Sequence, residues 1–274
     1  NTTGNYNTAL GLDVLQNNTG DDNTAVGRNA LNANTTGTKN VAIGAMAFDA
    51  NTVGGESVAI GYAALGASNR NDANTRAVAI GAYALSSNTT SMENVAVGWY
   101  ALSSTTTGEQ NTAVGRRALV TNVTGSYCTA LGFNALENNT VSNNTAVGYQ
   151  ALRANTTGDN NTAVGYNALT SNTTSNNNTA VGKQALQNCT TGHENTAIGY
   201  YTLQGLTTGD NNVALGEWSG SYVNALTTGQ YNVFLGNFTR GSSTTPSKQH
   251  VIGYDFGALA GNNTFSVQAS SGSY

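Results

Sequence analysis

The segment Asn161-Thr-Ala-Val-Gly-Tyr-Asn-Ala-Leu-Thr-Ser-Asn-Thr-Thr-Ser-Asn-Asn177 is a 17-residue unit that recurs along almost the whole chain of 274 residues. Each copy carries a signature glycine, which in most copies follows an alanine and an aliphatic residue. These glycines are 16 or 17 residues apart, except for two gaps of 20, and fall at positions 11, 27, 44, 61, 81, 98, 115, 132, 148, 165, 182, 199, 216, 236 and 253. A period this regular predicts units that stack on one another along an axis.

The short unit favours strands over helices. A repeat of two helices needs about 30 residues or more, and the frequent Gly, Thr and Asn oppose helix. The segment 24–27 alternates its side chains between two faces, residues 30–31 are expected to begin a second short strand, and residues 34–37 have turn chemistry. The sequence therefore predicts an all-β parallel β-solenoid of 17-residue coils, with a repeat array over 1–240 and a terminal coil, cap and linker over 241–274.

Three apolar columns run through the aligned repeats. The residue before each signature glycine is always Val, Ile or Leu, and we call this set the aliphatic column. The residue before that is alanine from Ala9 to Ala214, and a leucine or phenylalanine stands four residues after the glycine as far as Leu203. If alanine faces the lumen, alternation places the aliphatic column outside, as an apolar stripe that sister chains would bury. If the aliphatic and leucine columns fill the lumen instead, a monomer is self-sufficient.

The repeats also carry a family resemblance. The stretches Asn144-Thr-Ala-Val-Gly-Tyr-Gln-Ala-Leu152 and Asn155-Thr-Thr-Gly158 resemble head repeats of YadA-type trimeric autotransporter adhesins and of related phage tail-fibre proteins, over residues 1–253. The period here is longer than that of the best-known YadA head motif and closer to the fibre-protein arrays. The resemblance implies a left-handed β-roll, a homotrimeric fibre and attachment to a cell-surface glycan or protein receptor. Both a bacterial surface and a virion stay open as locations.

Composition agrees with an exposed extracellular fibre. Charged residues make up 9% of the chain, against about 25% in ordinary globular proteins, and the net charge is −4. The ten Lys and Arg residues are dispersed, which argues against a nucleic-acid partner. No apolar run approaches the roughly 20 residues of a membrane span, so no membrane insertion is expected. The chain begins within a repeat, so we expect it to be a piece of something longer.

Residues with catalytic or metal-binding chemistry are few and scattered. His193 and His250 lack a carboxylate or nucleophile at a spacing that would build a triad. Cys128 and Cys189 stand three coils apart, about 14 Å at ~4.8 Å per coil, and should be unpaired thiols. We therefore expect no catalytic residues, no cofactor, no metal site and no enzymatic activity.

An asparagine opens most coils, four residues before the glycine, and we call this set the opening asparagine column. Side-chain amides stacked in this way can hydrogen-bond from coil to coil, so a structural role is expected. Its members are Asn7, Asn23, Asn40, Asn94, Asn111, Asn144, Asn161, Asn178, Asn195 and Asn212.

Departures from the repeat are the candidate receptor contacts. The first 20-residue gap holds a longer, locally charged turn with Arg70, Asp72 and Arg76. The second holds Trp218 and Tyr222, and Tyr231 and four phenylalanines follow it. Aromatic residues near one end can form a cap over the last coils, which we favour, or a receptor-binding tip.

A second function class is an ice-binding solenoid. A threonine recurs in the turn at positions 89, 106, 140, 156, 173, 190 and 207 and could present regularly spaced hydroxyl and methyl groups. Val123 interrupts this threonine ladder, and adjacent Thr-Thr pairs alternate across a strand. Thermal hysteresis separates this function from adhesion.

Overall fold

The structure is a computed structural model, and it describes residues 3–67, 76–221, 226–257 and 261–267. These residues form three-residue strands joined by turns and bends, with no helix among them. The predicted all-β solenoid is confirmed. The chain divides into two compact units, Asn1–Asn143 and Asn144–Tyr274, which are described separately.

Each unit contains eight strands. Unit 1 holds β1 (Thr8–Leu10), β2 (Thr24–Val26), β3 (Val41–Ile43), β4 (Val58–Ile60), β5 (Val78–Ile80), β6 (Val95–Val97), β7 (Thr112–Val114) and β8 (Thr129–Leu131). Unit 2 holds β9 (Thr145–Val147), β10 (Thr162–Val164), β11 (Thr179–Val181), β12 (Thr196–Ile198), β13 (Val213–Leu215), β14 (Val233–Leu235), β15 (His250–Ile252) and β16 (Phe265–Val267).

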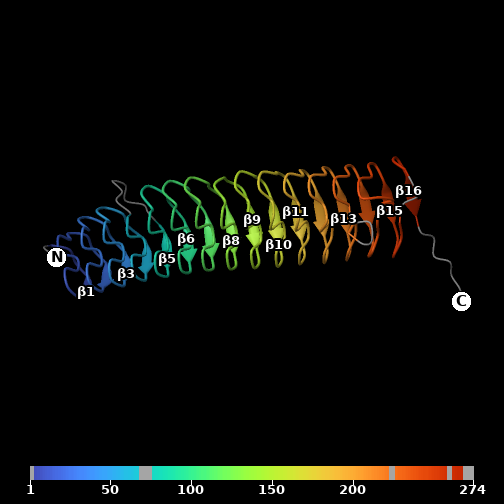
Figure 1. Cartoon of the computed structure of the whole chain (residues 1–274). Helices are drawn as coiled ribbons and strands as arrows, with labels where there is room; N and C mark the ends of the chain where they lie inside the picture. The colour runs from blue at the N-terminus through green and yellow to red at the C-terminus, as the bar shows by residue number, and fades with distance from the viewer. Residues whose placement is uncertain (1–2, 68–75, 222–225, 258–260, 268–274) are drawn as a thin grey trace, which may run out of the picture. The chain divides into compact units, whose positions relative to one another are not determined.

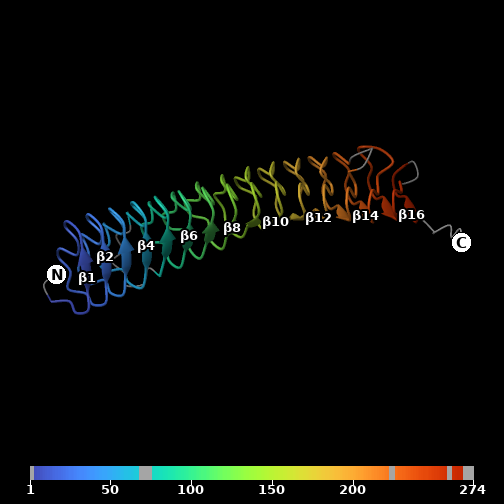
Figure 2. The ribbon, with the colours of Figure 1, turned by 90° about the horizontal axis from the view of Figure 1, so that it is seen from below.

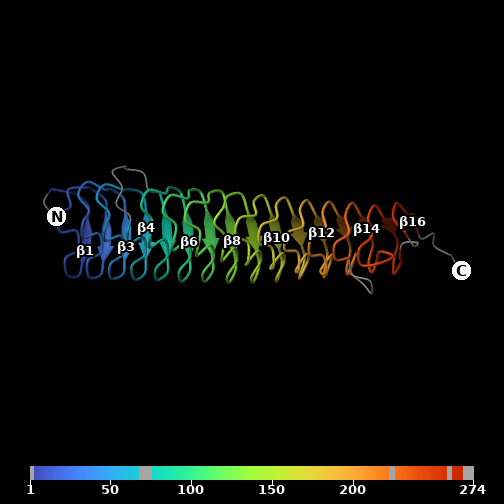
Figure 3. The same cartoon turned by 45° about the horizontal axis from the view of Figure 1, so that its top comes forward.

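Within each unit the strands stack in chain order, parallel and in register. Ala163 of β10, for example, pairs with Ala146 of β9 and with Ala180 of β11. Figure 1 shows this succession from blue to green for β1–β8 and from yellow to red for β9–β16, and Figures 2 and 3 show it from two other sides. One 17-residue repeat therefore makes one coil.

The strands turn their alanines inward and their aliphatic column outward. The central alanine of every strand from β2 to β13 is fully buried, while the two flanking residues are half-buried or exposed. The sequence left open which apolar columns face the lumen, and each of the two alternatives is right in part. The aliphatic column lies outside, but the leucine column lines the lumen together with the alanines.

The predicted second strand at residues 30–31 is wrong. From Gly27 to Gly216, the five residues after each glycine form a run of turns, in which the second and fourth residues adopt a left-handed conformation. In the coil of Gly27 these are Asn29, with φ of 61°, and Leu31, with φ of 48°. Leucine disfavours this conformation in isolation, so burial of its side chain in the lumen must offset the strain. A strand would have pointed adjacent Ala and Leu to opposite faces, whereas both are buried here.

The signature glycines allow the backbones of neighbouring coils to approach closely. At Gly165, φ is +139°, and an added Cβ would lie 2.4 Å from the carbonyl oxygen of Gly182 in the next coil. The same contact recurs at Gly115 and Gly148. Only glycine combines this conformation with this spacing.

Two buried asparagine columns hydrogen-bond the coils to one another. In the opening asparagine column, Asn161 accepts the backbone N–H of Asn178 at 3.0 Å and donates through Nδ2 to the carbonyl of Ser175 at 2.8 Å. A second set, which we call the turn asparagine column, lies seven residues after the glycine, and there Asn172 Nδ2 donates to Asn155 Oδ1 at 2.9 Å. The expected amide ladder is confirmed, although in the opening column most bonds join a side chain to backbone.

Near β14 the core is repacked around one large side chain. Phe234 takes the place of the inward alanine and is fully buried. The previous coil has Gly220 where leucine usually stands, and a Cβ at Gly220 would lie 3.1 Å from the Phe234 ring and 2.6 Å from Leu203. The ring therefore fills the space that the missing leucine leaves, and this phenylalanine belongs to the core.

Candidate functional site

The outward face of the strands carries the aliphatic column as a half-exposed row. Val114 in unit 1 is 38% exposed, and in unit 2 Ile198 and Leu215 are 42% and 38% exposed. The first residue of each strand, a Thr or Val in β2–β14, points to the same side because side chains two apart share a face. Each unit thus presents an apolar strip beside a row of threonines and valines.

Aromatic residues gather next to this strip, at the first and second positions after the signature glycines. Because every coil presents these positions at the same place, rings from successive coils meet. In unit 1 the aromatic cluster consists of Tyr62, Tyr83, Trp99, Tyr100 and Phe133, and in unit 2 of Tyr149, Tyr166, Tyr200, Tyr201 and Trp218.

The rings of the unit 1 cluster pack edge to face and face to face. Tyr83 stacks on Tyr100 with ring centres 4.7 Å apart, and Trp99 meets Tyr100 edge-on at 4.4 Å. Arg116 lies between Trp99 and Phe133, 4.8 and 5.2 Å from the two ring centres. Desolvation, together with the neighbouring Tyr62 and Tyr100, raises the pKa of Tyr83 above its usual value. Tyr83 therefore keeps its hydroxyl proton at neutral pH.

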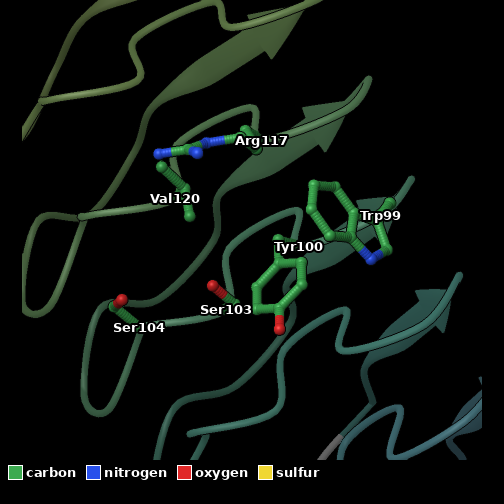
Figure 4. Close-up of a pocket in the computed structure, with 6 residues that line it drawn as sticks. All are labelled: Trp99, Tyr100, Ser103, Ser104, Arg117 and Val120. Atoms are coloured by element: carbon green, nitrogen blue, oxygen red, sulfur yellow. The ribbon is translucent and has the colours of Figure 1, made fainter.

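A pocket of about 310 Å³ opens beside Trp99 and Tyr100 of this cluster (Figure 4). Trp99 and Tyr100 lie on one side of it and Arg117 and Val120 on the other, while Ser103 and Ser104 complete the lining. Arg117 Nη2 forms an ion pair with Glu137 Oε1 at 3.0 Å. Its Nε is buried and has no hydrogen-bond partner among the described residues. An aromatic face, a guanidinium edge and two serines thus surround one space.

The unit 2 cluster contains a lysine beside its rings and a tryptophan stacked on its last tyrosine. Lys183 Nζ lies 5.9, 5.4 and 5.9 Å from the ring centres of Tyr166, Tyr200 and Tyr201. Trp218 lies flat on Tyr201, with centres 4.4 Å apart and planes 6° from parallel. Cation–π attraction holds the ammonium group of Lys183 beside these rings. The cation that this cluster attracts therefore comes from the chain itself.

Three of the six predicted receptor contacts can be located in the structure. Arg70, Asp72 and Tyr222 lie outside the described residues. Arg76 bridges two coils, with 3.3 Å ion pairs to Glu56 and to Glu93, so its charge is compensated within the chain. Exposed pairs of this kind contribute about 0–1 kcal/mol.

Of the two remaining predicted contacts, one follows its strand and the other precedes its strand. Trp218 follows β13 and belongs to the unit 2 cluster. Tyr231 precedes β14 and lines a separate depression of about 400 Å³ with Lys248, His250 and Phe265 among others. The sequence analysis missed the mid-chain aromatics, although reading the two positions after each glycine as columns would have revealed them.

No group of three His, Cys, Asp or Glu side chains among the described residues could hold a metal ion. His193 accepts the backbone N–H of Asn176 at 3.0 Å, which gives it a structural role. Nor does the described part contain a helix long and apolar enough to cross a membrane.

Both cysteines are buried in the asparagine columns, and neither forms a disulfide, as predicted. Burial raises the pKa of Cys189 to about 11, so it is a poor nucleophile. The asparagines of the sequons at 34, 88, 155 and 172 are also fully buried, so the folded coils do not expose them for glycosylation.

Comparison of the chain with models of known protein families, with curated proteins and with solved structures finds no match. The resemblance to adhesin head repeats therefore depends on the repeat motifs alone.

Proposed function

We propose that this chain is a shaft or head segment of a homotrimeric extracellular fibre that attaches a cell or a virion to a surface. The observation that supports it best is the outward aliphatic column. No polar residue interrupts this column in fifteen repeats, although the lumen is already filled by alanine, leucine and asparagine. Soluble monomers seldom expose contiguous apolar patches of more than a few hundred Å².

Parallel copies offer a direct way to cover this strip. Strands of one unit all run in the same direction, so copies related by rotation about an axis parallel to the stack would present the same face to one another, coil by coil. Val, Ile and Leu from each chain would then share a dry seam. The number three comes from the resemblance to trimeric head repeats, and the attachment role comes from the same source.

Three residues of β9, β10 and β11 provide a test of assembly. Val147, Val164 and Val181 are stacked neighbours in the aliphatic column. The triple substitution to asparagine should convert the trimer to monomers while leaving the circular dichroism spectrum of the strands intact. A matched control replaces Asn188 by serine, because Asn188 is exposed on a turn of the same unit. A triple variant that keeps the wild-type mass would contradict the proposed seam.

Attachment is tested separately from assembly. Beads coated with the chain should adhere to a panel of bacterial and animal cells, and soluble chain should compete with them. Absence of adhesion to every surface in the panel, with the trimer intact, would leave only a structural shaft.

Ice binding is the second candidate function, and the hydrogen bonds of the threonine ladder argue against it. Thr156 Oγ1 donates to the carbonyl of Thr173 at 2.9 Å, and Thr173 Oγ1 donates to Thr190 at 3.2 Å. Because these hydroxyl protons join one coil to the next, they are not offered to an ice lattice. A clear thermal hysteresis at micromolar protein would nevertheless overturn the adhesion proposal.

A further inference from the structure

The geometry points to a binding site for one neutral pyranose ring of a glycan, in the pocket between Tyr100 and Arg117. This inference rests on the proposed attachment function and names the class of receptor that the site would take. It involves a part of the coil that the aliphatic column does not use.

The pocket exists because a column of stacked rings is interrupted. Tyr83, Tyr100 and Arg117 occupy the second position after the glycine in three successive coils. Tyr83 covers one face of Tyr100 at 4.7 Å. Arg117, in the next coil, is turned toward Glu137, so the column offers no second described ring to stack on Tyr100, and the pocket opens between Tyr100 and Arg117 (Figure 4). In unit 2, Trp218 stacks on Tyr201 at the same column position.

The lining matches the two kinds of surface on a pyranose. The C–H face of a sugar ring packs on aromatic rings, and Tyr100 and Trp99 supply them. The hydroxyl rim needs donors and acceptors. Ser103 and Ser104 supply hydroxyls, and the guanidinium of Arg117 borders the same space.

Charge in and beside the pocket favours a neutral ligand over an acidic one. The guanidinium of Arg117 is paired with Glu137, which also accepts a 3.0 Å hydrogen bond from Asn134 Nδ2. The pair has no net charge to attract a carboxylate, and Glu137 would repel one. The volume of about 310 Å³ is at the low end of the roughly 300–1,000 Å³ typical of ligand pockets. One ring fits, with the rest of the glycan outside.

The pocket and the proposed seam are built from different parts of the coil. Tyr100, Ser103 and Ser104 belong to the turns that follow β6, and Arg117 and Val120 to the turns that follow β7. The outward strand residues do not line it. Chains that associate through their strands could therefore bind glycans at the same time.

Tryptophan fluorescence provides a direct test, because the chain has only Trp99 and Trp218. In the variant Trp218→Phe, Trp99 alone reports. Methyl glycosides of glucose, galactose, mannose and N-acetylglucosamine would be titrated to tens of millimolar, with glucuronic acid and N-acetylneuraminic acid as acidic probes. We expect a saturable change in emission with at least one neutral glycoside and none with the acids. No response to any neutral glycoside, or a response to the acids alone, would overturn the assignment.

Variants locate the binding, with saturation-transfer NMR as the readout in the otherwise unchanged chain. Tyr100→Ala should weaken binding about tenfold, and Tyr100→Phe should keep most of it, because the ring face makes the contact. Ser104→Ala, which removes only the hydroxyl, should weaken it about threefold. The matched control is Tyr201→Ala, at the same column position in unit 2, and it should have no effect. Equal losses at Tyr100 and Tyr201 would contradict this site.

The native mass of the same samples separates this inference from the proposed function. A trimer that binds no neutral glycoside overturns only the pocket assignment. A monomer that binds one overturns the assembly and keeps the pocket.

Discussion

The two faces of a single strand differ in what they require. In β10, Ala163 faces the lumen and is fully buried, while Thr162 and Val164 face outward and are half-buried. The inner face needs small residues, because the cross-section of a 17-residue coil is thin. The outer face has no such need, yet its aliphatic column is as regular as the inner one. Regularity inside is explained by packing within the chain, whereas regularity outside is what the proposed contact between sister chains would explain.

The largest effect is expected where the inner requirement involves the backbone itself. Gly165→Ala combines a conformation that non-glycine residues avoid, φ of +139°, with a Cβ 2.4 Å from the carbonyl oxygen of Gly182. We expect a loss of about 3–5 kcal/mol in the free energy of unfolding, measured by urea denaturation. The control is Tyr166→Ala, at the adjacent and exposed position. If both variants were equally stable, the coils would not touch at this glycine.

The second effect concerns the buried polar columns. Asn161→Ala removes the acceptor of the Asn178 N–H and the donor to the Ser175 carbonyl. Leaving these two buried groups unpaired should cost about 2–4 kcal/mol in the free energy of unfolding. Asn188→Ala on the exposed turn should change it by about 0.5 kcal/mol or less. Similar losses in both variants would show that the amide ladder contributes no stability.

Alkaline pH probes the inner face through Cys189, which replaces an asparagine of the turn column. Burial raises the pKa of its thiol from 9.0 to about 11, so the folded chain keeps the proton at pH values where the unfolded chain loses it. The stability that this thiol contributes is complete below about pH 9 and should fall by roughly 2–3 kcal/mol as the pH rises to 11.

Cys189→Asn, which restores the residue found at Asn172, provides the comparison. The difference in unfolding free energy between wild type and this variant should change across that pH window. A difference that stays constant between pH 8 and 11 would mean that Cys189 is accessible to water.

The smallest effect compares the two faces within one strand. Ala163→Leu overfills the lumen and should cost about 1–3 kcal/mol of unfolding free energy. Val164→Ile adds a methylene on the outer face, where Ile198 already stands two coils away, and should cost nothing. Thermal melting of the two single variants checks this. A larger loss for Val164→Ile would mean that the face assignment is reversed.

Much of the inner face could be predicted from the sequence because one interaction repeats in every coil. The alanine column, the asparagine ladder and the turn positions each appear in register, so the period alone predicted a stack of coils. The left-handed conformation at Leu31 and its equivalents could not be predicted, since leucine disfavours it and only tertiary burial selects it. For the same reason, the sequence alone did not decide which apolar columns face the lumen.

The candidate site was less predictable because it depends on what varies between coils. The pocket arises from one arginine in a column that elsewhere stacks aromatic rings, and from the reach of that arginine to Glu137 in the next coil. The residues that depart most clearly from the repeat lie at the two 20-residue gaps, and they do not line this pocket. Of these, Arg76 lies in ion pairs and Trp218 lies in a closed stack.

Sedimentation equilibrium of the wild-type chain at micromolar concentration tests most directly whether the outer aliphatic column is covered by sister chains. The account predicts a single species with three times the chain's mass of 28.1 kDa. A stable, soluble species of 28.1 kDa would contradict it, because the aliphatic column would then face water without a partner.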